Sequence, residues 1–99
     1  MAKVTIFLKP IAMMGMMFYD KKVIPVVREH LPDYKNVCTF EHDKSGEEAA
    51  EEAFDLTNNP ERQDEREQKY GRGQSLSSGD VVDVDGEKFL CMSFGWAKL

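Results

Sequence analysis

An Asp-Gly pair between two apolar runs is the feature that most constrains how this chain folds. Asp85-Gly86 is a preferred sequence for a two-residue type I′ turn, which joins two antiparallel strands and sets the register between them. That register brings opposite charges together near the turn and apolar side chains together at its base. The expected pairs are Val84 with Glu87, Asp83 with Lys88, Val82 with Phe89, and Val81 with Leu90. We therefore predict a C-terminal β-hairpin.

The second strand of this hairpin carries apolar side chains on both faces, which is typical of a strand in the interior of a sheet. Gly95 permits a bend or bulge after it. The Ser-Leu-Ser-Ser-Gly-Asp run of residues 75–80 is expected to form a turn whose hydroxyls cap backbone groups. The aromatic and apolar side chains expected in the core are Leu90, Met92, Phe94 and Trp96.

The first 42 residues are expected to supply two strands and two less regular segments. Apolar–polar alternation predicts strands over residues 3–9 and 34–42. In residues 21–30, two β-branched residues lie on each side of Pro25, which favours an extended edge segment. A short helix beginning near Pro25 is the alternative. Residues 11–20, with Gly15 inside a methionine-rich stretch, are expected to form a loop or a poorly formed helical turn.

The main helix is predicted over residues 46–58. Ser45 and Glu48 have the spacing of a capping box, and the acidic residues at the start of the helix suit its dipole. Small and apolar residues at helical spacing give the helix one buried face, and Asn58-Asn59-Pro60 ends it.

Residues 60–73 are almost entirely polar and are predicted to form a mobile charged segment. A solvated helix is the alternative, since Glu61, Glu65 and Lys69 fall four residues apart. The whole chain, residues 1–99, is expected to be a single α+β domain. One main helix would pack on a small, mostly antiparallel sheet of four or five strands.

Charge and hydropathy narrow the range of partners. The net charge is −5, and residues 41–67 hold eleven acidic and three basic side chains, so this segment carries −8 and the remainder +3. Surfaces that bind nucleic acid are normally cationic, so the charge disfavours that partner. No apolar run approaches the length of about 18 residues needed for a membrane span, and the apolar run at the start of the chain is too short for a signal sequence. A cytoplasmic protein with Cys38 and Cys91 reduced, and with no membrane partner, is expected.

The residues that most often carry chemistry do not form a recognisable set. His30, Cys38 and His42 could suggest a metal site, but Cys38 and His42 would lie about 13 Å apart on a strand, too far to share one metal ion. The aspartates at 80, 83 and 85 lack the ligand spacing of a calcium loop. The serines at 75, 77, 78 and 93 have no evident activating base. We therefore predict a protein that is not an enzyme and that uses no metal or cofactor.

Two surfaces are candidates for contact with a partner. A flexible, polarizable methionine–aromatic segment is typical of adaptable interfaces, although the same residues are also suited to filling gaps in a core. The acidic face of the helix could imitate the charge of nucleic acid, although most such faces are simply solvated. The first candidate comprises Met13, Met14, Met16, Met17, Phe18 and Tyr19, and the second comprises Glu47, Glu48, Glu51 and Glu52.

Several short motifs occur together in this chain. They are Phe-Asp-Leu-Thr-Asn at 54–58, Ser-Leu-Ser-Ser-Gly-Asp-Val-Val at 75–82, Gly86, and Ser-Phe-Gly-Trp at 93–96. This arrangement resembles a group of small uncharacterised proteins of actinobacteria, their phages and other mobile elements, and more loosely the YodL-like domain of mobile-element proteins. The chain departs from the pattern with Ser78 in place of an apolar residue and Gln74 in place of an arginine. The resemblance implies no activity, only the context of a phage or mobile-element accessory protein.

These observations predict a non-enzymatic interaction module that binds and modulates a host or phage protein. Its partner is an unidentified protein, and the chain itself is expected to be a monomer or a homodimer. The alternative is a nucleic-acid-binding or regulatory domain that uses the positively charged remainder of the chain.

Overall fold

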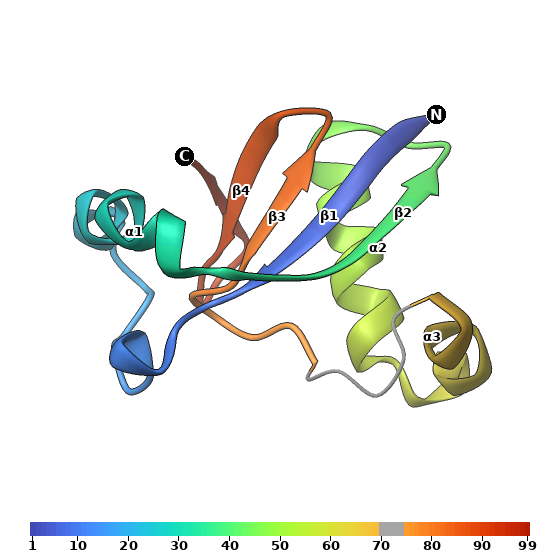
Figure 1. Ribbon diagram of the computed structural model, residues 1–99, viewed down its shortest axis with the longest axis horizontal. Coiled ribbons are helices and arrows are strands. Elements are labelled where there is room, and N and C mark those ends of the chain that lie inside the picture. Colours follow the sequence, from blue (N-terminus) through green and yellow to red (C-terminus); the bar gives the residue numbers. More distant parts are fainter. Residues whose placement is uncertain (70–74) are drawn as a thin grey trace.

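Five antiparallel strands form one sheet in the computed structural model, which describes residues 1–69 and 75–99 (Figure 1). The strand order is β2-β1-β3-β4-β5, and every neighbouring pair is antiparallel. The strands are β1 (Ala2–Leu8), β2 (Lys35–His42), β3 (Val81–Val84), β4 (Glu87–Cys91) and β5 (Trp96–Lys98). The α+β class and the antiparallel sheet predicted from the sequence are confirmed.

The C-terminal hairpin has the predicted register. β3 and β4 pair as expected from Val81 with Leu90 to Val84 with Glu87, and β4 lies inside the sheet between β3 and β5. Asp85 and Gly86 have φ of 53° and 94°, as a type I′ turn requires. Next to the turn, Asp83 and Lys88 form a cross-strand ion pair with an N–O distance of 3.0 Å.

The prediction of one main helix is wrong, because three α-helices are present in the described residues. They are α1 (Ile24–His30), α2 (Gly46–Asn58) and α3 (Gln63–Lys69), and single 3₁₀ turns are η1 (Ile11–Met13), η2 (Lys21–Val23), η3 (Leu31–Asp33) and η4 (Pro60–Arg62). In Figure 1, α2 lies behind the sheet, whereas α1 lies at the left of the view. The helices therefore cover different parts of the sheet.

Residues 21–30 are helical rather than extended, so the edge-strand prediction is wrong and its helical alternative is right. Pro25 occupies the first turn of α1, where a backbone N–H would have no intrahelical partner, so the ring costs the helix little. Val27 is fully buried, and this tertiary contact outweighs the preference of β-branched residues for strands.

Helix α2 has the predicted bounds, but its capping box does not form. The Ser45 side chain makes no hydrogen bond to the helix. Gly46 has a φ of +59°, so the chain turns left-handed between Ser45 and the first regular helical residues, which separates the hydroxyl from the N–H groups that it would cap.

The segment after α2 is helical as far as it is described. Asn59 caps η4 by accepting a hydrogen bond from the N–H of Glu61, and α3 follows directly. This corresponds to the solvated-helix alternative for residues 60–69. Residues 70–73 of the predicted mobile segment lie outside the described residues.

Buried side chains form two clusters, one on each face of the sheet, because alternate residues of a strand point to opposite faces. The larger cluster packs beneath α2 and includes Val4, Ile6, Phe40, Ala53, Leu56, Val82, Val84 and Phe89. The smaller cluster packs beneath α1 and the segment before it, and comprises Met13, Phe18, Val27, Tyr34, Val81, Leu90 and Ala97. The fold is therefore a layer of sheet with a core on either side.

Phe94 does not belong to either cluster, so the prediction that it is a core residue is wrong. Its side chain is 87% exposed. The N–H of Met92 donates to the carbonyl oxygen of Gly95 at 2.9 Å, so the chain leaves β4 in a tight turn and the strand alternation stops at Cys91. Met92 and Trp96 flank this turn and are partly buried.

Candidate functional site

The Ser-Leu-Ser-Ser-Gly-Asp run forms a structural turn that uses its polar groups internally. Asp80 is 2% exposed; its Oδ1 accepts from the backbone N–H of Lys9 at 2.9 Å and its Oδ2 from that of Ser77 at 2.9 Å. The Lys9 ammonium lies 3.5 Å from the same carboxylate. The Ser75 hydroxyl donates to the carbonyl oxygen of Thr57 at 2.8 Å. These groups tie the turn to the end of β1 and to α2. Of the hydroxyls predicted to cap backbone groups, that of Ser75 does so, whereas that of Ser77 contacts the side chains of Lys9 and Asp80.

The histidines lie next to carboxylates that are close in the sequence, and the cysteines are buried. His30 is 3.6 Å from Asp33, and His42 is 3.2 Å from Asp43. Burial raises the pKa of the Cys91 thiol to about 12, and burial likewise raises that of Cys38, whose thiol donates to the carbonyl oxygen of Lys69. Within residues 1–69 and 75–99, no three His, Cys, Asp or Glu side chains are grouped as ligands for a metal ion.

The predicted acidic surface is divided between a carboxylate in an internal ion-pair network and carboxylates exposed to solvent. Arg62 lies between Glu52 and Glu65, with N–O distances of 2.7 Å to each, and also contacts Asp55 at 2.8 Å. The hydrogen bonds from Arg62 are the main reason that the pKa of Glu65 falls to about 2. Glu52 therefore belongs to an internal ion-pair network rather than to the solvent-facing acidic surface.

The other three predicted acidic residues extend toward solvent from α2. Glu48 lies 3.5 Å from the exposed Lys44, and Glu47 is exposed at the first turn of the helix. Glu51 is also exposed and accepts a hydrogen bond from the indole N–H of Trp96. These carboxylates give the solvent side of α2 a negative charge.

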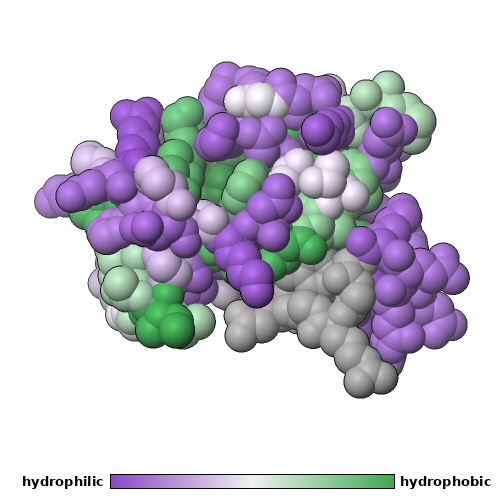
Figure 2. Space-filling model, in the orientation of Figure 1, coloured by the Kyte–Doolittle hydropathy of each residue, from purple (hydrophilic) through white to green (hydrophobic). Residues whose placement is uncertain are grey.

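The predicted methionine–aromatic surface divides in the same way. Met13 and Phe18 are buried in the smaller core cluster, so they cannot contact a partner in the folded protein. Met17 and Tyr19 are 65% and 59% exposed, and Met14 is exposed as well. Met16 is partly buried against the same cluster. Figure 2 shows apolar side chains gathered at the lower left, over the segment between β1 and α1, whereas α3 at the right is covered by hydrophilic ones.

The turn after β4 joins these two predicted surfaces. The N–H of Ser93 donates to the carbonyl oxygen of Phe18 at 2.7 Å, which fixes the turn against the methionine–aromatic segment. Three residues later, the indole of Trp96 binds Glu51 of α2. The exposed ring of Phe94 lies between these two attachments in the sequence. Sequence reasoning missed Phe94 as a surface residue, and the signal available was the glycine that follows it.

A small hollow of about 170 Å³ lies between this turn and α2. Its aromatic walls are Phe54 and Trp96, whose rings meet edge to face with centroids 6.4 Å apart. Glu51 contributes a carboxylate. The other lining residues are Cys91, Met92, Ser93 and Gly95. We refer to this hollow as the aromatic hollow.

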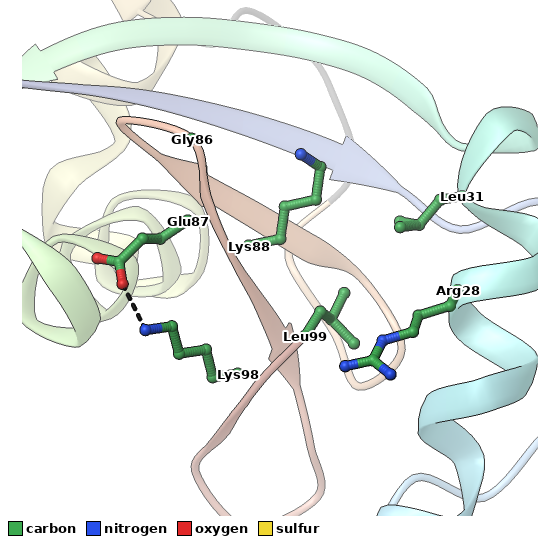
Figure 3. A pocket seen from close by; sticks show the side chains of 7 residues that line it. All are labelled: Arg28, Leu31, Gly86, Glu87, Lys88, Lys98 and Leu99. Carbon is green, nitrogen blue, oxygen red and sulfur yellow. Dashed lines mark ion pairs between the residues drawn. The ribbon is translucent and has the colours of Figure 1, made fainter.

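A second hollow, of about 460 Å³, lies between α1 and the hairpin tip (Figure 3). Three cationic side chains line it, those of Arg28, Lys88 and Lys98. Lys98 is paired with Glu87 at 2.6 Å, drawn as the dashed line in Figure 3, and Lys88 is paired with Asp83. Because two of its three cations are already neutralised, this hollow offers little net attraction for an anion.

Comparisons with known proteins found no relative of this chain. The chain matches no protein-family model, no curated protein and no solved structure. In the described parts of the chain, every helix is too short or too polar to cross a membrane.

Proposed function

We propose that the protein is a non-enzymatic interaction module that binds another protein through an apolar patch formed by Met17, Tyr19 and Phe94. As the sequence resemblance implies, it would act as a phage or mobile-element accessory protein in the bacterial cytoplasm and modulate the protein that it binds.

The observation that carries this proposal is the exposure of Phe94. A phenylalanine that is 87% exposed loses the free energy of burial that its ring would gain in a core, on the order of 2 kcal/mol. The hydrogen bond between Ser93 and Phe18 holds its turn against the segment that exposes Met17 and Tyr19. Large apolar side chains gathered on a surface mark contact sites for other proteins, and aromatic residues and methionine are enriched in such sites.

The alternative, nucleic-acid binding, is less well supported by the charges. The cations that line the hollow beside α1 are mostly paired with carboxylates, and the solvent side of α2 is acidic. A phosphate backbone needs an excess of cations on one face. An electrophoretic shift assay at several salt concentrations tests this alternative, and salt-sensitive binding of DNA or RNA would replace the present proposal.

Affinity capture from bacterial lysate with the full chain as bait tests the proposal directly. Phe94→Asp and Met17→Asp should each abolish capture of the partner, because they place a charge in an apolar contact. Gln68→Asp introduces the same charge on α3, at the other side of the molecule in Figure 1, and should leave capture unchanged. All three positions are exposed, so circular dichroism should show unchanged folds.

If no protein is captured, or if Phe94→Asp and Met17→Asp capture the same protein as the unmodified chain, then the apolar patch is not the interface.

A further inference from the structure

The apolar patch and the acidic side of α2 meet at a single turn. Ser93 attaches this turn to the segment that carries Met17 and Tyr19, and Trp96 attaches it to Glu51. The aromatic hollow lies between the turn and α2. A partner that covers Phe94 therefore also reaches the hollow and the carboxylates beside it.

The aromatic hollow has the groups that accommodate a cationic side chain. Phe54 and Trp96 form an edge-to-face pair, and the faces of such rings attract an ammonium or guanidinium group. The carboxylate of Glu51 lines the same hollow and is exposed, so it can pair with that cation. Apolar walls with one carboxylate suit the long stem and the charged end of lysine or arginine.

The charge around the hollow extends this complementarity. Glu51 also lines a neighbouring hollow of about 350 Å³ along α2, so the two hollows adjoin its side chain. That second hollow is lined by Glu48, Glu51, Glu52, Asp55, His42 and Lys44. Arg62 pairs with both Glu52 and Asp55, and Lys44 pairs with Glu48, but the four carboxylates still outnumber these two cations. A nucleic acid or an anionic lipid would bring phosphates against these carboxylates, whereas a basic protein segment would pair with them.

We propose that this combined surface binds a basic amphipathic segment of a partner protein. A lysine or arginine of the segment enters the aromatic hollow beside Glu51, its further cations lie along the solvent side of α2, and its apolar side chains cover Phe94, Met17 and Tyr19. The inference rests on the proposed function, and it adds the chemistry of the partner.

Fluorescence of Trp96, the only tryptophan of the chain, gives a direct reading of this site. The probes are synthetic peptides without tryptophan: an amphipathic leucine–lysine peptide, a leucine–glutamate peptide of the same pattern, and a serine–lysine peptide of the same charge. The leucine–lysine peptide should change the Trp96 emission in a saturable way. The leucine–glutamate peptide should not bind, and the serine–lysine peptide should bind about tenfold more weakly because it lacks apolar anchors.

Variants separate specific binding from general attraction to an acidic protein. Glu51→Gln keeps an oxygen to accept the Trp96 hydrogen bond but removes the charge, and should weaken binding about threefold. Phe94→Ser should weaken it about tenfold. Glu67→Gln removes the same charge from an exposed position on α3, outside both hollows, and should leave the affinity unchanged.

The inference is overturned if the leucine–lysine peptide does not bind, if the leucine–glutamate peptide binds equally well, or if Glu51→Gln and Glu67→Gln have equal effects. The proposed function fails separately, through the capture experiment. A partner captured in a Phe94-dependent manner whose contact segment is acidic would retain the proposed function and reject the basic segment.

Discussion

Gly79 occupies the most crowded glycine position of the described structure. It has a φ of +96°, and a Cβ atom there would lie 2.6 Å from the Cε2 and Cζ atoms of Phe18 and 2.9 Å from the Cδ atom of Lys9. Phe18 is buried, so its ring cannot move aside cheaply. The carbonyl oxygen of Gly79 also accepts a hydrogen bond from the buried Tyr34 hydroxyl at 2.6 Å. This glycine therefore allows β1, β3 and the methionine–aromatic segment to pack closely.

Gly79→Ala should lower the free energy of unfolding by about 2–5 kcal/mol, which combines about 1–2 for the left-handed backbone and about 1–3 for the steric clash. Gly15→Ala is the matched control, because Gly15 has a similar φ of +91° but no atom within 4 Å of the added methyl. Gly15→Ala should lower the free energy of unfolding only by the backbone contribution, about 1–2 kcal/mol. Urea unfolding of both variants measures the difference, and equal losses would show that the site around Gly79 can relax.

The candidate site was predictable in its parts but not in its assembly. Met17 and Tyr19 were recognised from composition, because methionine beside aromatic residues is typical of adaptable surfaces. Strand alternation continued past Cys91 predicts a buried Phe94, but the turn to Gly95 ends that alternation. The position of this turn depends on tertiary hydrogen bonds, from Ser93 to Phe18 and from Trp96 to Glu51, between residues far apart in the sequence, and no local pattern predicts these.

Among the elements, α3 is held to the rest of the protein mainly by polar contacts. It has no buried residue. Arg62, which immediately precedes α3, binds Glu52 and Asp55 of α2, and Arg66 donates to the carbonyl oxygen of Thr57 at 2.7 Å. The Lys69 ammonium lies 5.6 Å from the centre of the Phe40 ring. Without apolar burial, α3 is expected to open more readily than the sheet.

Arg62→Lys should increase amide hydrogen exchange in α3 about tenfold. Lysine keeps the charge but cannot make the two-pronged contacts that the guanidinium makes with Glu52 and Glu65. The free energy of global unfolding should change by less than about 1 kcal/mol, because the core is untouched. Lys44→Gln removes an exposed pair with Glu48 and should leave exchange in α3 unchanged. Equal exchange in Arg62→Lys and the unmodified protein would mean that other contacts hold α3.

The attachment of α3 should also persist in moderately acidic solution. The pKa of Glu65 is lowered to about 2, first by the hydrogen bond from Arg62. Because this value lies below that of an unfolded glutamate, about 4.3, the stabilisation is fully present above that pH and is lost as pH falls toward 2. NMR titration of the Glu65 carboxyl group measures this directly. Arg62→Lys should raise the pKa toward the ordinary value, and an unshifted pKa in the unmodified protein would contradict the ion-pair geometry.

Elements with strong local signals were predicted and those that depend on tertiary contacts were not. The Asp85-Gly86 turn fixes its own register, and α2 has both an apolar stripe and a defined end, so both were predicted correctly. The sequence of α1 favours a strand, and the helix forms because Val27 is buried against the rest of the core. The capping box failed for the same kind of reason, since the conformation of Gly46 overrides the spacing of Ser45 and Glu48.

For the molecule as a whole, the two cysteines report on two different levels of opening. Cys38 lies on the edge strand β2, and its thiol donates to the carbonyl oxygen of Lys69, the last residue of α3. Cys91 ends the interior strand β4, and its backbone exchanges hydrogen bonds with Gly79 and Asp80. Exposure of Cys38 therefore requires α3 to move, whereas exposure of Cys91 requires the sheet to separate from the turn before β3.

Thiol labelling under native conditions should follow this order, with each site identified by peptide mass spectrometry. Cys38 should react faster than Cys91, its rate should rise with salt as the ion pairs of α3 are screened, and Arg62→Lys should accelerate it about tenfold. Cys91, whose pKa is raised to about 12, should react only through global unfolding, so its rate should rise steeply with urea. Identical rates and urea dependences for the two thiols would show that α3 and the sheet open as one cooperative unit, because a helix that opens independently must uncover Cys38 first.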